Sequence, residues 1–378
     1  MRSSGRHAQS GSAESLAAAC RNTDFVRLQA TADGDALAAL GQLAGALHAT
    51  ETPFHATVER VPDAAATDGL TVCLGTDADA DIALTEEPLA GTAYAAAAEL
   101  GAEPDAVLAL AGTVAAGRAP EAHTELYESA ATRLDRRPGV AVPVGGDAET
   151  LADGLAHSTL VHADFSATRD VAVGLIERLD AERLDAETHR RVASAVALRA
   201  IEDSPADAAE RVWRVLHPHS GGPFATVGGY ADVLDACARR KPGLGVALAI
   251  DAARTGDGST HAEAALDVWR EHATAAHGGL RSGETARHSG LFVIRVGTDA
   301  ATTPPLGTIA RLGLAFRSPE SLVLAVDGER AALSGARAGE HAQRVGTATD
   351  AAATGRTTTG YIDGIDAETA EMEVRHAV

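Results

Sequence analysis

Two aspartates separated by one glycine, Asp33-Gly34-Asp35, form the turn of this sequence that is best suited to chemistry. The turn lies between Phe25–Ala30, which alternates like a strand, and Ala36–Ala49, whose leucines share one helical face. Carboxylates at the carboxyl end of a parallel strand point into the crevice where α/β proteins bind ligands, and two of them can hold one Mn²⁺ or Mg²⁺ ion. We expect Gly34 to supply the backbone freedom of the turn. The alternative is that Asp35 caps the helix that follows.

A second acidic turn follows another strand-like segment. Leu70–Leu74 is apolar and leads into residues 75–81, which have an aspartate at every second position from Asp77 onward. Two strands that end in acidic loops would suit a two-metal phosphoesterase, with Asp33, Asp35 and Asp77 as metal ligands. A solvated loop on an acidic surface explains the second turn at least as well.

Histidine pairs are a further candidate for metal binding. His157 and His162 flank the segment Ser158-Thr159-Leu160-Val161, and His217 and His219 flank Pro218. Neither pair is followed by a second cluster, so we interpret most of the 15 histidines as surface cations that replace lysine. The absence of GxGxxG, GxxxxGK[ST] and GxSxG motifs argues against the common dinucleotide-binding, P-loop and hydrolase classes.

The net charge indicates the salinity in which the protein works and says little about what the protein binds. Asp and Glu number 53 against 32 Lys and Arg, the formal charge is −21, and Lys241 is the only lysine. These acids are spread along the whole chain, as in haloarchaeal cytoplasmic proteins that work in molar salt. The Debye length there is about 3 Å, so the charge does not exclude a nucleic-acid ligand.

Cysteine usage and hydropathy point to the cytoplasm. The three cysteines lie far apart and contain no CxxC pair, which argues against a disulfide framework or a cysteine-rich zinc site. The first 12 residues lack the apolar region of a signal peptide, and no apolar run reaches the roughly 18 residues of a membrane span. We therefore expect no membrane partner.

The order of the segments predicts an α/β fold that begins with a parallel sheet. After about residue 136 the pattern changes to amphipathic helices such as Ala186–Ile201, although Ser158–Ala163 has the composition of a strand. The C-terminal part again mixes strands such as Leu322–Val326 with helices. We predict a disordered tail at 1–13, an α/β domain at 14–165, a helical connecting region at 166–280 and a smaller α/β domain at 281–378.

Taken together, these segments resemble the DHH phosphoesterase superfamily, and most closely its archaeal RecJ-like branch. The resemblance covers the chain from about residue 22 to the end and is carried by residues 31–39, 88–94 with 110–115, 229–239, and 307–311 with 334–337. The segment 31–39 (TADGDALAA) resembles the first family motif, and 229–239 resembles the family's LNAxGR helix. The resemblance implies a DHH-type N-terminal domain and a C-terminal DHH-associated domain, which grips single strands in the family.

The metal-binding motifs of the family are degenerate in this chain. No histidine lies between Asp81 and Leu89, so the Asp-His-His signature is absent; Ala115-Ala116 replace a metal-binding Asp; and Gly355-Arg356-Thr357 replace the C-terminal Gly-Gly-His. Active relatives need several carboxylates and a histidine around two Mn²⁺ ions, whereas only Asp33 and Asp35, together with Asp77 of the second acidic turn, remain here. Such losses should abolish two-metal catalysis.

Two main classes of function remain open. The first is a RecJ-like protein of DNA replication or repair that has lost catalysis, like the RecJ-like scaffold of the CMG replicative helicase, which binds the GINS complex. The second is an active single-strand-specific exonuclease that uses Mn²⁺ or Mg²⁺. The ligand count favours the first class, and an assembly protein without a nucleic-acid role is a third option.

Any contact with a phosphate backbone should fall to arginine, because lysine is nearly absent. Arg337 and Arg356 in the C-terminal domain and Arg239 in the LNAxGR-like helix are the candidates for binding single-stranded nucleic acid. The alternative for each is a surface arginine that pairs with one of the many acids.

Overall fold

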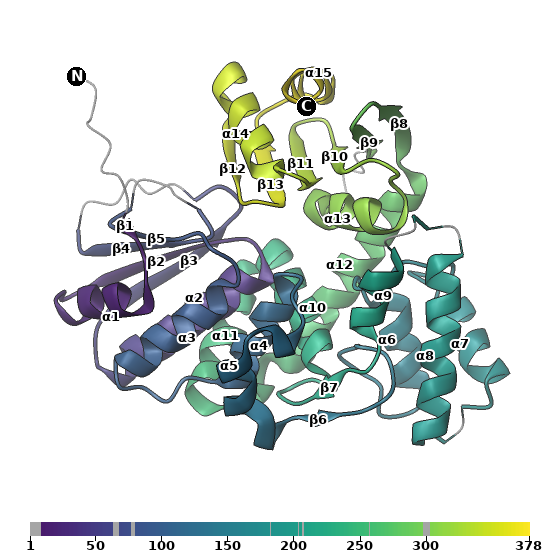
Figure 1. Cartoon of the computed structure of the whole chain (residues 1–378), viewed down its shortest axis with the longest axis horizontal. Coiled ribbons are helices and arrows are strands. Elements are labelled where there is room, and N and C mark those ends of the chain that lie inside the picture. The colour runs from purple at the N-terminus through teal and green to yellow at the C-terminus, as the bar shows by residue number, and fades with distance from the viewer. Residues whose placement is uncertain are drawn as a thin grey trace. The chain divides into compact units, whose positions relative to one another are not determined.

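The computed structural model describes residues 9–62, 68–76, 80–181, 183–202, 204–205, 208–256, 258–297 and 303–378. The chain forms two compact units, each built from two separate stretches. Unit 1 comprises Met1–Asp135 and His219–Trp269, and unit 2 comprises Arg136–Pro218 and Arg270–Val378 (Figure 1). The domain boundaries expected at residues 165 and 280 stay a prediction, because compactness alone does not define an evolutionary domain.

Unit 1 contains a five-stranded sheet in which every pairing is parallel. Its strands are β1 (Gln9–Ser10), β2 (Val26–Thr31), β3 (Phe54–Glu59), β4 (Leu70–Leu74) and β5 (Ile82–Leu84), in the order β1-β5-β4-β2-β3. The predicted α/β class with a parallel N-terminal sheet is thereby confirmed. All carboxyl ends of these strands share one edge, where the turn Asp33-Gly34-Asp35 lies after β2.

Seven α-helices belong to the described part of unit 1. They are α1 (Ala13–Arg21), α2 (Gly34–Ala49), α3 (Leu89–Glu99), α4 (Ala106–Ala115), α5 (Thr124–Ala130), α10 (Val227–Arg240) and α11 (Pro242–Thr255). Short 3₁₀ turns (Pro120–Ala122, Ala131–Arg133 and Ser259–His261) and the two-residue strands β6 (Asp135–Arg136) and β7 (His219–Ser220) occur in the connecting segments.

Helix α2 is the centre of unit 1. The sequence predicts one apolar face, yet every residue from Gly34 to Leu47 is buried, because α3, α4, α10 and α11 surround the helix. Gly41 and Gly45 permit a close contact with α11: a Cβ atom at either position would lie within 3 Å of the Cβ atom of Ala249 or Ala253. Small residues on both helices therefore set a short distance between their axes.

Unit 2 begins with four helices and ends with a mixed sheet. The helices are α6 (Ala148–His157), α7 (Arg169–Arg178), α8 (Ala186–Ile201) and α9 (Ala208–Val215). The strands are β8 (Glu284–His288), β9 (Leu291–Arg295), β10 (Leu322–Val326), β11 (Arg330–Gly335), β12 (Ala352–Gly355) and β13 (Thr359–Asp363), in the order β12-β13-β11-β10-β9-β8. Helices α13 (Leu306–Phe316), α14 (Ala338–Thr349) and α15 (Ala367–Ala377) accompany this sheet, and α12 (Ala262–Ser282) links the two units along the chain.

Strand β10 explains how the C-terminal sheet is buried on both faces. Val323 and Ala325 belong to a core shared with α13 and the helices α6 to α9, whereas Leu322, Leu324 and Val326 belong to a second core beneath α14 and α15. Alternate residues of a strand face opposite sides of a sheet, so two cores require a continuous apolar run. This strand therefore reads LVLAV without a polar residue.

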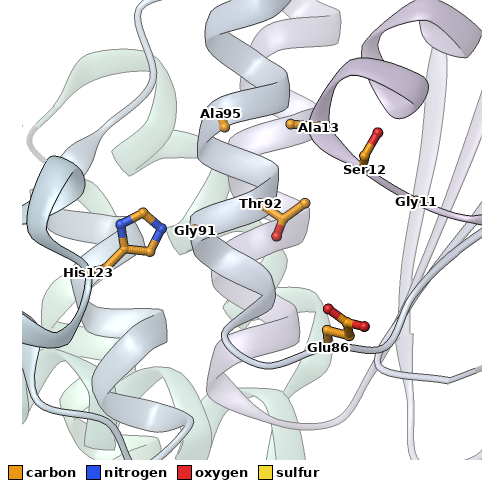
Figure 2. Close-up of a pocket in the computed structure, with 8 residues that line it drawn as sticks. All are labelled: Gly11, Ser12, Ala13, Glu86, Gly91, Thr92, Ala95 and His123. Atoms are coloured by element: carbon orange, nitrogen blue, oxygen red, sulfur yellow. The ribbon is translucent and has the colours of Figure 1, made fainter.

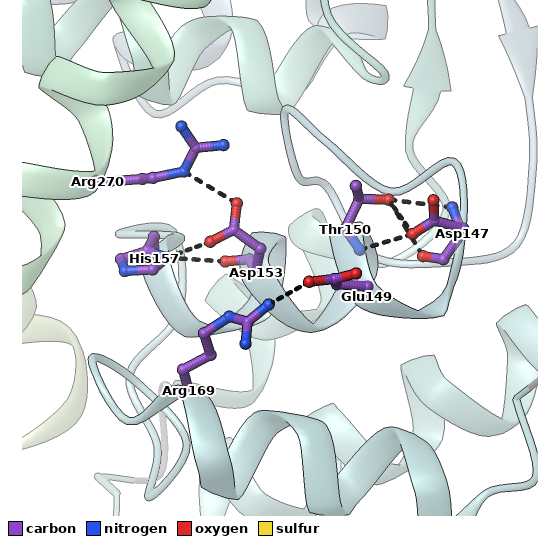
Figure 3. Close-up of polar contacts among 7 residues, drawn as sticks. All are labelled: Asp147, Glu149, Thr150, Asp153, His157, Arg169 and Arg270. Atoms are coloured by element: carbon purple, nitrogen blue, oxygen red, sulfur yellow. Dashed lines mark hydrogen bonds and ion pairs between the residues drawn. The ribbon is translucent and has the colours of Figure 1, made fainter.

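Two acidic side chains on α6 pair with arginines from other segments (Figure 3). Asp153 accepts a hydrogen bond from Nε of Arg270 at 3.0 Å and pairs with Nδ1 of His157 at 3.0 Å. Glu149 pairs with Arg169 at 2.8 Å. Arginine thus provides the positive partners of both acids, as expected for a chain with one lysine.

The interpretation of histidines as surface cations is wrong for several of them. Five described histidines are buried, namely His162, His219, His272, His277 and His341. His162 and His277 share a hydrogen bond between their Nδ1 atoms (2.9 Å), and Nε2 of His277 lies 3.1 Å from the Ser158 carbonyl. Donation from Nε2 to that carbonyl leaves Nδ1 of His277 as the acceptor, which requires a neutral ring.

The segment 158–163 is a loop, not the expected strand. Its polar groups bond to side chains instead of to a neighbouring strand. Besides the Ser158 carbonyl, the Thr159 carbonyl and hydroxyl accept hydrogen bonds from Arg311 at 3.1 and 2.8 Å. Such non-local partners cannot be read from strand-like composition. In the part of the chain that the structure describes, every helix is too short or too polar to cross a membrane.

The buried histidine pair predicts a loss of stability in mild acid. Burial, with smaller effects from Arg317 and Arg281, lowers the pKa of His162 from 6.5 to about 4, and burial also lowers the pKa of His277. Between these pH values the unfolded chain binds more protons than the folded chain, so the free energy of unfolding should decrease as the pH falls. His162 alone should account for about 3 kcal/mol between pH 6.5 and 4.

Denaturant titrations at a series of pH values in molar KCl test this expectation. His162→Asn should flatten the pH dependence between pH 6.5 and 5, and His376→Asn, on the exposed end of α15, should leave it unchanged. Equal pH slopes in the wild-type protein and His162→Asn would show that the buried pair does not control acid stability.

Candidate functional site

The carboxylate of Asp33 caps the helix that starts at the turn. Asp33 Oδ1 accepts a hydrogen bond from the Ala36 N–H at 3.0 Å, and Oδ2 accepts one from the Thr31 hydroxyl at 2.7 Å. Thr31 is the last residue of β2, so the aspartate joins the end of the strand to the start of α2. The N-cap of this helix is therefore Asp33 rather than Asp35.

Asp35 caps a different helix. Its side chain is 1% exposed, Oδ2 accepts from the Leu89 N–H at 2.9 Å, and Oδ1 accepts from the Ala90 N–H at 3.0 Å. These are the first two residues of α3, and Pro88 before them offers no side-chain cap. The N-terminus of a helix carries partial positive charge and unpaired N–H groups, and this carboxylate satisfies both.

Gly34 has a spatial role instead of the expected conformational one. It is the first residue of α2 and is not among the glycines with positive φ. A Cβ atom there would lie 2.9 Å from the Cβ atom of Ala115 and 3.1 Å from the Asp235 nitrogen. The missing side chain lets α4 and α10 approach the start of α2, and the Gly34 N–H donates to Asp235 Oδ1 at 3.1 Å.

Arg239 lies within this same network. Its Nε and Nη2 atoms donate to the two carboxylate oxygens of Asp235, both at 2.9 Å, and the two side chains are only 12% and 11% exposed. A bidentate pair of this kind fixes the orientation of both groups. Arg239 therefore holds Asp235 against the Gly34 N–H, and its role as a nucleic-acid ligand stays a prediction.

The described donors do not fit a two-metal centre. Asp33 and Asp35 lie in one turn, but Asp77 falls outside the described residues. Within the described ranges no group of three or more His, Cys, Asp and Glu side chains is placed to hold a metal ion. Two Mn²⁺ or Mg²⁺ ions need more oxygen and nitrogen ligands than these two aspartates supply.

A polar pocket of about 440 Å³ opens near the carboxyl ends of β1 and β5 (Figure 2). Polar groups on its wall come from Ser12, Glu86, Thr92 and His123. The imidazole of His123 packs against Gly91, where a Cβ atom would lie 2.8 Å from the ring. The volume is in the range of small-ligand sites, and the lining offers both donors and acceptors of hydrogen bonds.

None of these pocket residues belongs to a sequence motif that predicts a site. One available signal was the position of Glu86, an acid that follows strand β5 at the ligand-binding edge of a parallel sheet. His123 carried no such signal, because it reaches the pocket from the segment before α5. Its approach depends on a glycine in α3, which sequence spacing does not reveal.

The other two candidate arginines lie at one corner of the C-terminal sheet. Arg337 precedes α14 with a φ of 55° and donates from Nε to Glu340 at 2.9 Å. The Gly339 N–H donates to the Arg356 carbonyl at 3.0 Å, which brings the two segments together. Arg337 and Glu340 are 58% and 56% exposed, so their ion pair is weak and an incoming phosphate could replace the carboxylate.

Comparison with known proteins finds a matching family model and a matching haloarchaeal relative. The family described as "Uncharacterized protein rrnAC1427, C-terminal domain" matches residues 283–377. The protein rrnAC1427 of Haloarcula marismortui is 44% identical over 324 residues, which cover 84% of this chain and 82% of that protein. The chain belongs to the rrnAC1427 family. Its relative comes from a haloarchaeon, in agreement with the interpretation of the acidic composition.

Solved structures show the fold of this rrnAC1427-family chain. CDC45 from Entamoeba histolytica aligns with a TM-score of 0.59 and 8% identity, covering 96% of this chain and 97% of that one. Thermus thermophilus RecJ in complex with Mn²⁺ aligns at 0.48 and 14%, and the chain spans about half of its length, covering 97% of this chain and 53% of that one. This chain therefore shares the fold of CDC45, and the expected α/β fold class is confirmed.

Replacement of Asp35 should destabilise this rrnAC1427-family protein strongly. Asp35→Ala would leave the buried Leu89 and Ala90 N–H groups without acceptors, which should lower the free energy of unfolding by about 2–4 kcal/mol. Asp147→Ala is a matched control, because Asp147 caps α6 from an exposed position and should cost about 1 kcal/mol. Denaturant unfolding measures both, and equal losses would contradict the structural role of Asp35.

Proposed function

We propose that this protein is a RecJ-like scaffold of DNA replication or repair that has lost two-metal catalysis. The observation that carries the proposal is the engagement of Asp35, whose two oxygens each accept a hydrogen bond from the start of α3. A metal ion on these oxygens would weaken bonds to two buried N–H groups. The only other described aspartate of the turn, Asp33, caps α2.

The family fold without a full ligand set supports a role in assembly. The likeness to CDC45 extends over 96% of this chain and 97% of that one, so the shared fold is not limited to one domain. In the RecJ-like branch, the scaffold of the CMG helicase binds the GINS complex. We propose GINS or another replicative helicase component as the protein partner, single-stranded nucleic acid as a second ligand, and the cytoplasm as the compartment.

Divalent metal remains relevant only to the alternative function. An active single-strand-specific exonuclease would need Mn²⁺ or Mg²⁺ held by Asp33, Asp35 and Asp77 together with further ligands. Thermus thermophilus RecJ has been solved in complex with each of these ions. That alternative predicts a reaction that a direct assay can detect.

A nuclease assay distinguishes the two functions. The purified protein in molar KCl with Mn²⁺ should release no mononucleotides from a labelled 5′-phosphorylated single strand, because the described ligands are too few for two metal ions. Release that is lost in Asp33→Asn but kept in Asp147→Asn, another N-cap aspartate, would establish the exonuclease and refute the scaffold.

A pull-down from lysate kept in molar KCl tests the positive part of the proposal. The tagged full-length chain should recover GINS or helicase subunits, which mass spectrometry can identify. A tagged cytoplasmic protein of similar acidity serves as the control, since carboxylate-rich surfaces share nonspecific partners. Recovery of none of these subunits, at a bait level sufficient to detect them, would contradict the assembly role.

A further inference from the structure

The polar pocket of unit 1 collects three side chains that the fold does not use. In the part of the chain that the structure describes, the side chains of Glu86, Thr92 and His123 line this pocket and make no hydrogen bond or ion pair. Other helical threonines donate to the carbonyl four residues earlier, as Thr113 and Thr347 do at 3.0 and 2.9 Å. The polar atoms of the pocket are therefore available to a ligand.

Three separate segments bring these groups to one cavity of about 440 Å³ (Figure 2). Glu86 follows strand β5 by two residues, at the edge of a parallel sheet where α/β proteins bind ligands. Thr92 is the fourth residue of α3, and His123 directly precedes α5. The ring of His123 contacts α3 at Gly91, where a Cβ atom would lie 2.8 Å from both Nε2 and Cδ2. Packing thus fixes the position of the imidazole at the pocket wall.

The lining of the pocket does not suit an anion or an apolar ligand. None of the described residues that line it is Lys or Arg, and Glu86 would repel a phosphate or a carboxylate. The apolar side chains of the lining are the methyl groups of Ala13 and Ala95, which offer little surface for hydrophobic burial. The hydroxyl of Ser12 already caps α1. The pocket therefore fits a polar ligand without negative charge.

High salt favours a neutral ligand over a cation. The composition and the haloarchaeal relative indicate molar salt, in which the Debye length is about 3 Å. Attraction between an ammonium group and the exposed Glu86 is weak under these conditions, and K⁺ competes for the carboxylate. An ionised carboxylate has two oxygens that only accept hydrogen bonds, whereas a hydroxyl and a neutral imidazole both donate and accept. Ligand hydroxyl groups match this combination, because they also donate and accept.

We propose that the pocket binds a neutral ligand through two hydroxyl groups on adjacent carbon atoms. Glu86 accepts one hydrogen bond from each hydroxyl, and Thr92 and His123 bond to the hydroxyl oxygens. Sugars and ribonucleosides share this vicinal diol, whereas a 2′-deoxyribonucleoside lacks it. The site uses neither Asp33 nor Asp35, and it does not depend on the proposed scaffold role.

Saturation-transfer NMR titrations of the full chain in molar KCl test the ligand chemistry. The diol probes are cytidine and methyl β-D-ribofuranoside, and 2′-deoxycytidine is the matched control. Both diols should bind, and 2′-deoxycytidine should bind about tenfold more weakly than cytidine, because it loses one hydrogen bond to a carboxylate. Equal affinity for the two diols would identify a sugar as the ligand, and tighter binding of cytidine would identify a ribonucleoside.

Two pairs of variants test the place of binding. Glu86→Gln should weaken cytidine binding about tenfold, because a carboxamide keeps only one accepting oxygen, whereas Glu103→Gln changes an exposed acid outside the pocket lining and should have no effect. Ala95→Leu should fill the pocket and abolish binding, and Ala98→Leu, at another exposed position of α3, should preserve it. Thermal unfolding in the same buffer checks that each variant is folded.

Several results would overturn the proposal. These are equal binding of cytidine and 2′-deoxycytidine, absence of binding by both diols, and cytidine binding that Ala95→Leu leaves intact. Binding of spermidine with the same dependence on Glu86, but without binding of a diol, would overturn it in favour of a cationic ligand. None of these titrations involves a nuclease substrate or a helicase subunit, so failure of this site is distinguishable from failure of the proposed function.

Discussion

The N-terminal unit depends on one buried carboxylate. Helix α3 starts directly after a proline and has no cap of its own, so its first N–H groups would be buried without acceptors. Asp35 supplies both acceptors from the first turn of α2. A buried charge is costly unless hydrogen bonds compensate it, and here the helix terminus provides the compensation. This contact fixes the start of α3 against the first turn of α2.

The neighbouring residues of the turn extend the same constraint to other helices. Gly34 allows close packing of α4 and α10 and donates its N–H to Asp235, which Arg239 orients. Thus a turn of three residues joins a strand and four helices. A sequence motif of this kind can be retained for folding after its chemistry has gone, so its presence alone is a poor criterion for nuclease activity.

Much of the architecture could be predicted because it is local. Strand alternation, leucine spacing and the order of segments were sufficient for the α/β class and the parallel sheet. The ion pair between Asp235 and Arg239 could also have been predicted, since residues four apart share a helical face. The capping of α3 by Asp35 was not, because the two partners are 54 residues apart.

The remaining errors share a physical cause. Neither the burial on all sides of α2 nor the burial of His162 is encoded in the spacing of nearby residues. Both depend on segments that arrive from elsewhere in the chain, such as α11 and His277. Composition can also mislead, because a chain with one lysine still uses histidine inside its core.

The division of unit 1 into two stretches has a consequence for synthesis on the ribosome. The parallel sheet and α2 are translated within the first 135 residues, but α10 and α11, which cover α2, emerge only after residue 219. At about 5–20 residues per second, the nascent chain spends several seconds with the apolar surface of α2 incompletely covered. We therefore expect chaperones to bind the unfinished unit 1 during synthesis. Unit 1 can be completed only when α10 and α11 have been made, and these follow the helices α6 to α9 of unit 2 in the sequence.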